Sequence, residues 1–304
     1  RLPAHHADMI ATGHCKSFPG RRMKVRTGMT HRIFRFAALL AGLLLTSFVA
    51  ILPSQALEGE WQDLPNARAR LLAIGDPMSG RLLAGLEIEL DKNWKTYWRA
   101  PGDSGIPPTF DWSGASNIAQ TRPKFPAPIR FTDEYGESVG FKKHVVFPIE
   151  IDLRRPGVPT NLELNVILGI CREVCIPVSE RFSLKIPPIF VATDTAKELL
   201  NSATASVPIV ASGSERPQIS IVERAGKTAV LTIRVPSDLQ IQDVFVEGPQ
   251  TWFLGLPKKL PSSDGASGGE WALALDGVPL GESPWGAEMR LTMVGPVQSF
   301  EQDF

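Results

Sequence analysis

The chain has 304 residues with 32 basic and 32 acidic side chains, so its formal net charge at pH 7 is zero. Eight of the basic residues but only one of the acidic residues lie in residues 1–56, which leaves 24 Lys and Arg against 31 Asp and Glu in residues 57–304. This larger part is therefore acidic. Nucleic-acid binding requires a basic surface, so we expect no nucleic-acid partner.

The N-terminal segment has the pattern of an export signal. Residues 1–22 show no pattern of structure, and we interpret them as an upstream extension that is not native to the protein. In residues 23–56, basic side chains precede an apolar run and a small-residue cleavage site, Ser54-Gln55-Ala56, which is typical of a signal peptide. A membrane anchor is the alternative, because the apolar run approaches the length of a bilayer span. Pro53 and the cleavage site favour removal, after which we expect no membrane-spanning segment.

The chain from residue 57 onward consists of short apolar or alternating runs separated by Pro and Gly, which predicts an all-β protein. A first set of strands is expected at residues 69–74, 81–90, 96–99, 109–112, 144–152, 161–170 and 181–186. Seven strands in this region predict an immunoglobulin-like β-sandwich over residues 57–190.

Beyond the first set, the composition shifts to Ala, Ser and Thr over residues 191–217, which we interpret as a linker with a short helix at 194–203. A second set of strands is expected at residues 219–224, 229–235, 243–247, 271–275 and 288–294. This set predicts a second, smaller β-sandwich-like domain over residues 218–304.

Few residues outside the cysteines suggest chemistry. His144 is the one histidine beyond residue 56, which argues against zinc sites and hydrolases built on histidine; we interpret it as a surface or strand-end residue. Glu87 and Glu89 are two residues apart in an expected strand, a spacing typical of the solvent face of a half-buried sheet. We expect Tyr97 and Trp98 to pack in the core of the sandwich.

The run ILGICREVCIP, residues 167–177, contains the two cysteines of the mature chain, Cys171 and Cys175. In a straight strand, residues four apart are separated by about 13 Å, whereas a disulfide needs Cα atoms within about 7 Å. A bonded pair therefore requires a turn, and Arg172-Glu173 is a suitable polar turn. Closing so short a loop contributes only about 2 kcal/mol of stability, and strain in a tight ring makes the bond easier to exchange.

Three interpretations of the cysteine pair follow. A structural disulfide is the first. Two thiolates that hold Cu(I) are the second, since this ion prefers sulfur ligands, although no methionine or histidine cluster lies nearby in the sequence. Reversible thiol-disulfide exchange is the third, and we favour it because a bridge that stabilises so little is suited to chemistry.

Three longer runs carry a family resemblance: NWKTYWRAPGDSGIPPTFDW (93–112), FTDEYGESVGFKKHVVFPIEIDL (131–153) and LGICREVCIPVSERFSL (168–184). In order and spacing, residues 60–190 resemble the N-terminal periplasmic domain of the thiol:disulfide interchange protein DsbD. Within that family they are most similar to the branch that includes the suppressor-of-copper-sensitivity membrane protein ScsB.

The resemblance implies a periplasmic protein-disulfide reductase component with an immunoglobulin-like fold and with neither cofactor nor metal. It implies electron transfer from a membrane-embedded reductase domain, here expected on another polypeptide, to periplasmic thioredoxin-fold proteins, in processes such as cytochrome c biogenesis and copper tolerance. Cys171 and Cys175 match the redox pair, with Cys175 forming the mixed disulfide. The segment Asp133-Glu134-Tyr135-Gly136 matches the cap loop, in which Tyr135 is the aromatic residue nearest to the one that covers the sulfur pair in relatives.

This sequence departs from the family in two places. Its cysteines are separated by three residues, whereas the better-known relatives have five, and its cap is one residue shorter, which affects the role expected for Tyr135. A non-catalytic two-domain periplasmic binding module with a structural disulfide, or a Cu(I)-binding protein, is the alternative function.

Overall fold

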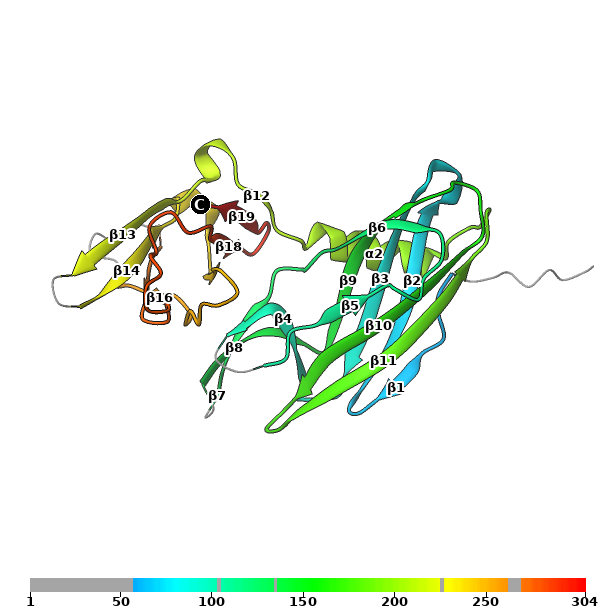
Figure 1. Cartoon of the computed structure of the whole chain (residues 1–304), viewed down its shortest axis with the longest axis horizontal. Helices are drawn as coiled ribbons and strands as arrows, with labels where there is room; N and C mark the ends of the chain where they lie inside the picture. Colours follow the sequence, from blue (N-terminus) through cyan, green and yellow to red (C-terminus); the bar gives the residue numbers. More distant parts are fainter. Residues whose placement is uncertain (1–56, 103–104, 134–135, 225–226, 262–268) are drawn as a thin grey trace, which may run out of the picture. The chain divides into compact units, whose positions relative to one another are not determined.

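The computed structural model describes residues 57–102, 105–133, 136–224, 227–261 and 269–304 (Figure 1). Strands dominate this part of the chain, which confirms the all-β class. The predicted upstream extension and signal peptide lie outside the described residues. Within the described ranges, no helix combines the length and apolarity needed to cross a membrane.

Two antiparallel sheets form a sandwich from residue 62 to residue 186. The first sheet has the order β1 (Gln62–Leu64), β2 (Ala67–Asp76), β3 (Arg81–Leu90), β9 (His144–Leu153) and β6 (Ile118–Pro123). The second has the order β11 (Cys175–Ile186), β10 (Thr160–Cys171), β4 (Lys95–Gly102), β8 (Gly136–Lys142) and β7 (Ile129–Asp133), and β5 (Thr109–Asp111) also pairs with β10. The sheets pack through alternating apolar residues, as in other sandwiches.

Strand β10 shows how this alternation places the two faces of the second sheet. Its even-numbered residues from 162 to 170 are buried in the core between the sheets: Leu162, Leu164, Val166, Leu168 and Ile170. Because successive side chains point to opposite faces, Cys171 lies on the outer face. The side chains of the neighbouring strand β4 alternate in the same way. Ile170 is paired with Thr96 and Cys171 with Lys95, so Lys95 shares the outer face with Cys171.

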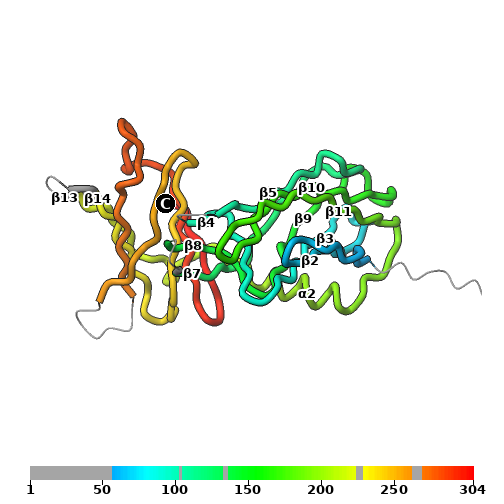
Figure 2. Tube along the Cα trace, turned by 90° about the horizontal axis from the view of Figure 1, so that it is seen from below, coloured from blue at the N-terminus to red at the C-terminus, as the bar shows by residue number. Residues whose placement is uncertain are grey.

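Helix α2 (Asp194–Ala205) covers the outer face of the first sheet. Thr193 caps it, because its hydroxyl accepts a hydrogen bond of 3.0 Å from the Ala196 backbone N–H. Leu200 packs with Val146 and other buried residues of the sheet. A Cβ atom at Gly85 would lie 2.5 Å from Leu200 Cδ2, so the missing side chain allows the helix to approach. Figure 2 shows α2 on one side of β2 and β3, and β10 on the other.

One expectation for this sheet is wrong. Glu87, which we placed on a solvent face, is only 3% exposed. Its carboxylate accepts hydrogen bonds from Arg70 Nε at 2.6 Å and from His144 Nε2 at 2.8 Å. Arg70 also donates to Glu58, which in turn accepts from the Thr193 hydroxyl. The face is covered because this polar network joins the sheet to the N-terminus of α2.

Two further sheets of four strands follow. The first has the order β12 (Ile209–Val210), β19 (Phe300–Asp303), β18 (Arg290–Val294) and β15 (Asp243–Glu247). The second has the order β13 (Gln218–Arg224), β14 (Lys227–Arg234), β17 (Glu270–Ala274) and β16 (Lys258–Lys259). Short 3-10 turns occur at η1 (Pro77–Ser79), η2 (Gly213–Glu215) and η3 (Ser237–Leu239). Our division of the chain at residues 191–217 stays a prediction.

Candidate functional site

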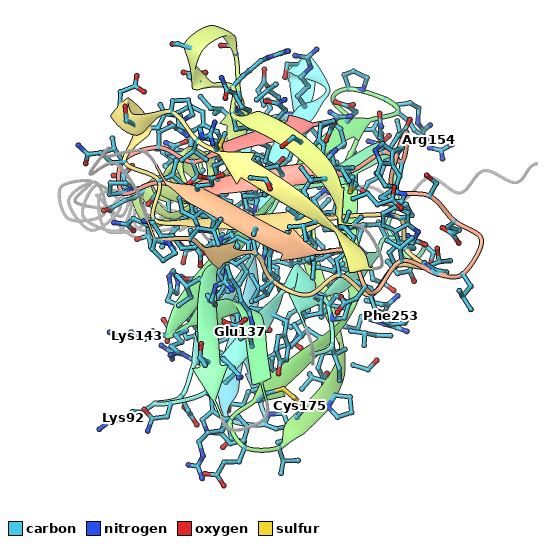
Figure 3. The ribbon with its side chains drawn as sticks, turned by 90° about the vertical axis from the view of Figure 1, so that its left-hand side faces the viewer. Lys92, Glu137, Lys143, Arg154, Cys175 and Phe253 are labelled. Atoms are coloured by element: carbon cyan, nitrogen blue, oxygen red, sulfur yellow. A yellow bond between two sulfur atoms is a disulfide. The ribbon has the colours of Figure 1, made fainter. Side chains whose placement is uncertain are left out.

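The two cysteines close the β10–β11 hairpin and form a disulfide, with Cα atoms 4.2 Å apart. Cys171 is the last residue of β10 and Cys175 the first of β11, and the two are directly paired in the ladder. Arg172, Glu173 and Val174 make the turn between them, and the first two are the residues at which the sequence predicted a turn. Figure 3 shows the disulfide, with Cys175 labelled, on the ribbon of this hairpin.

The two cysteines differ in their access to solvent. Cys171 is 1% exposed, whereas Cys175 belongs to the exposed residues. The next residue toward the turn, Val174, is 72% exposed. Of the two cysteines, Cys175 is therefore the residue that is open to solvent.

Among the described residues, Tyr97 makes a hydrogen-bond contact with the Cys175 sulfur. Its hydroxyl lies 3.0 Å from Cys175 Sγ. A sulfur in a disulfide carries no hydrogen, so the hydroxyl is the donor. The ring itself is 1% exposed, and it fits between two glycines. A Cβ at Gly105 would lie 2.6 Å from Tyr97 Cδ1, and one at Gly169 would lie 3.1 Å from Cδ2.

This contact was missed from the sequence, because we grouped Tyr97 with Trp98 as core residues. Both are buried, but adjacent residues of a strand point to opposite faces. Trp98 joins the core between the sheets, and Tyr97 lies on the outer face with the cysteines. The alternation of β4, together with the register to β10, is the signal that would have separated them.

Lys95 is buried on the same outer face. It is 8% exposed and directly opposes Cys171 across the β4–β10 ladder. Its ammonium donates to the Ser138 hydroxyl at 3.1 Å. The same Nζ atom lies 5.3 Å from the ring centroid of Phe131 and 6.0 Å from that of Tyr97. A cation is therefore held among aromatic rings on the outer face of this sheet.

The predicted cap segment lies at the β7–β8 hairpin. Asp133 ends β7, Gly136 begins β8, and the two are paired in the ladder. Gly136 has φ = 118°, a left-handed value that favours glycine. Glu134 and Tyr135 lie outside the described residues. The hairpin is in the same sheet as the cysteines, two strands away from β10.

His144 and Glu87 form a separate polar pair in the first sheet. The His144 side chain is 41% exposed, while that of Glu87 is 3% exposed. Burial raises the pKa of Glu87, but hydrogen bonds from His144 and Arg70 outweigh it and hold the pKa below the ordinary value. Among the described residues, no group of three or more His, Cys, Asp and Glu side chains is arranged to hold a metal ion.

Comparison with known proteins finds a family model that matches the part of the chain containing this site. Residues 66–187 match the family model described as the N-terminal part of the thiol:disulfide interchange protein DsbD. The predicted resemblance to this family is confirmed. The matched residues run from the start of β2 to the end of β11 and include the disulfide hairpin.

A solved structure with a similar fold is the N-terminal periplasmic domain of ScsB from Proteus mirabilis. Its TM-score with this chain is 0.65 at 22% sequence identity, and the match covers 82% of this chain and 98% of that chain. The shared fold therefore extends beyond the segment that matches the family model. No curated protein sequence matches the chain.

Proposed function

We propose that this protein is a periplasmic thiol-disulfide exchange protein. Its Cys171–Cys175 pair would pass electrons from a membrane-embedded reductase domain on another polypeptide to oxidised thioredoxin-fold proteins. The observation that carries this proposal is the hairpin disulfide between an exposed residue, Cys175, and a buried one, Cys171. The description of the matched family, and the periplasmic origin of the structurally similar ScsB domain, support it. The signal-peptide pattern of residues 23–56 supports export.

The exchange proceeds in two displacements. The Cys175 thiolate attacks the partner's disulfide, forms a mixed disulfide, and expels one partner thiolate. The Cys171 thiolate then attacks Cys175 Sγ, which forms the Cys171–Cys175 bond and expels the second partner thiolate. Two electrons pass to the partner, whose thiolates take up protons from water. A reductase dithiol restores the reduced pair by the same displacements in reverse.

Cys175 takes the role of attacking sulfur because it is exposed, and Cys171 resolves the intermediate because its buried sulfur is reached only from within the hairpin. We assign Asp133, Glu134, Tyr135 and Gly136 the role of a cap over the pair. Such a cover restricts exchange to partners that displace it, which protects the thiolate in an oxidising compartment.

The pairing of strands β10 and β11 argues against a purely structural role for the disulfide. Cys171 and Cys175 are the final pair of a hairpin whose register runs without a shift from Thr160 and Ile186. Strand pairing already holds these two residues together. The covalent bond therefore constrains the chain little, as expected from its short loop.

Trapping of a mixed disulfide tests the proposal. The Cys171→Ala variant keeps the attacking thiol but removes the resolving one, so we expect it to accumulate a mixed disulfide with a periplasmic thioredoxin-fold protein, detected on a non-reducing gel and by mass spectrometry. Cys175→Ala is the matched control and should accumulate much less. Failure of both variants to trap any such protein would overturn the relay function.

A further inference from the structure

We propose that Lys95 is the electrostatic group that makes the buried Cys171 sulfur reactive. In this inference, which rests on the proposed function, the Lys95 ammonium stabilises the Cys171 thiolate of the reduced pair. It thereby promotes the second displacement, in which Cys171 attacks Cys175 Sγ and releases the reduced partner.

The first observation is the position of Lys95 in the sheet. Lys95 and Cys171 are directly opposed across the β4–β10 ladder. Directly opposed residues of an antiparallel pair share a face, with Cβ atoms about 4.5–5.5 Å apart. No other strand lies between them, so the lysine stem begins beside the cysteine side chain.

The second observation is how the ammonium is held. It donates to Ser138 Oγ at 3.1 Å and lies over the rings of Phe131 and Tyr97. These contacts keep it on the outer face of the sheet. Tyr97 links the cation to the sulfurs, because its hydroxyl is 3.0 Å from Cys175 Sγ. With Lys95 only 8% exposed, water screens its charge weakly, so the field reaches the sulfurs across protein.

The third observation is that Cys171 needs such a group. Burial disfavours a charged thiolate and raises the pKa of a thiol, and Cys171 is 1% exposed. The adjacent Arg172 is a poor source of compensation, because its side chain is 50% exposed and water screens its charge. Lys95 is a buried cation on the face of Cys171.

Strand β4 thus contributes one side chain opposite or in contact with each of the two cysteines. Lys95 and Tyr97 are two residues apart and share a face. Tyr97 donates to Cys175, the sulfur that meets the partner, and Lys95 opposes Cys171, the sulfur that resolves the intermediate.

The test measures Cys171 alone, in the full-length chain carrying Cys175→Ala. Its alkylation rate is followed against pH, and the labelled peptide is identified by mass spectrometry. We expect Lys95→Met to move the midpoint upward by about one pH unit, which is a tenfold smaller thiolate fraction at neutral pH. Lys95→Arg keeps the charge, so the midpoint of its alkylation profile should stay close to that of the parent protein.

Lys142→Met is the matched control. Lys142 directly opposes Lys95 on β8, and its Nζ lies 4.5 Å from the Phe131 ring centroid, but its side chain is exposed. Lys142→Met should change the midpoint of the alkylation profile by less than half of the change in Lys95→Met. An unchanged profile in Lys95→Met, or equal shifts in Lys95→Met and Lys142→Met, would overturn the assignment.

Two safeguards keep the outcome interpretable. Circular dichroism and thermal unfolding establish that each variant is folded, and Lys95→Gln replaces Lys95→Met if the latter is not. Because the alkylation profile needs no partner, it separates this inference from the proposed function. A failure of trapping with a shifted profile would reject the relay alone, and successful trapping with an unshifted profile would reject the role of Lys95 alone.

Discussion

Tyr97 donates its hydroxyl hydrogen to Cys175 Sγ across 3.0 Å, from a ring that is itself 1% exposed. A buried phenol therefore contacts the sulfur of the exposed cysteine. When the pair is reduced, the same hydroxyl can donate to the Cys175 thiolate, and hydrogen bonds to a charged form favour that form.

Tyr97→Phe keeps the ring and removes this donor. We expect the alkylation rate of reduced Cys175 at pH 7 to fall by about three- to tenfold, because a lost hydrogen bond to a charged group is worth about 1 kcal/mol or more. The reduction potential, measured against glutathione, should become more negative, since the reduced form loses stabilisation. A rate and potential equal to those of the wild type would show that the contact has no chemical effect.

Gly169→Ala tests how the ring is held. The new Cβ would lie 3.0 Å from Ile106 Cβ and 3.1 Å from Tyr97 Cδ2, so these neighbours must shift by a few tenths of an ångström, which lengthens the contact of the tyrosine with Cys175. We expect a loss of about 1–3 kcal/mol in the free energy of unfolding. The alkylation of reduced Cys175 should also be slower, as in Tyr97→Phe. Gly255→Ala, where a Cβ meets nothing within 4 Å, is the control and should change stability by about 0.5 kcal/mol or less.

Removal of the disulfide distinguishes a redox pair from a structural bridge. The Cys171→Ala/Cys175→Ala variant should lose no more than about 2 kcal/mol in urea unfolding, because the closed loop is short. A loss above about 4 kcal/mol, or a reduction potential below about −300 mV, would favour the structural role.

Glu87 predicts a pH dependence of stability. Its pKa in the folded protein is lowered from 4.5, with burial outweighed by the hydrogen bonds from His144 and Arg70. A lowered pKa contributes stability that is present above the unfolded value and is lost as the pH falls through the folded value. Glu87→Gln should therefore destabilise the protein at pH 7 and flatten the decline below about pH 5.

Glu89→Gln is the control for that experiment. Glu89 pairs with Arg68, but the two side chains are 39% and 47% exposed, and exposed ion pairs contribute about 0–1 kcal/mol. Urea unfolding from pH 3 to pH 7 compares the two variants. Equal pH profiles for both would contradict a special role for the buried carboxylate.

The sequence predicted the strands whose apolar residues recur clearly. Residues 81–90 and 243–247 coincide with β3 and β15. Strands β6, β7 and β8 were missed because they are short, polar or rich in glycine, as in the GESVGFK run of β8. Their pairing depends on neighbours far along the chain, which local periodicity does not contain.

The candidate site was predicted in part. The cysteines and their turn were recognised because the residue types and spacing carry the information. The partners Tyr97 and Lys95 required the register of β4 against β10, which only the folded sheet supplies. The burial of Glu87 likewise depends on Glu58 and on the cap of α2, two segments that lie far from it in sequence.

The unshifted ladder of the β10–β11 hairpin has a consequence for recognition. Eleven register pairs besides the cysteine pair hold the two strands together, so reduction of the disulfide leaves the backbone of the hairpin in place. An electron donor and an electron acceptor would then meet nearly the same surface. A docking protein must distinguish the oxidised from the reduced state by the two sulfur atoms themselves and by the side chains in contact with them.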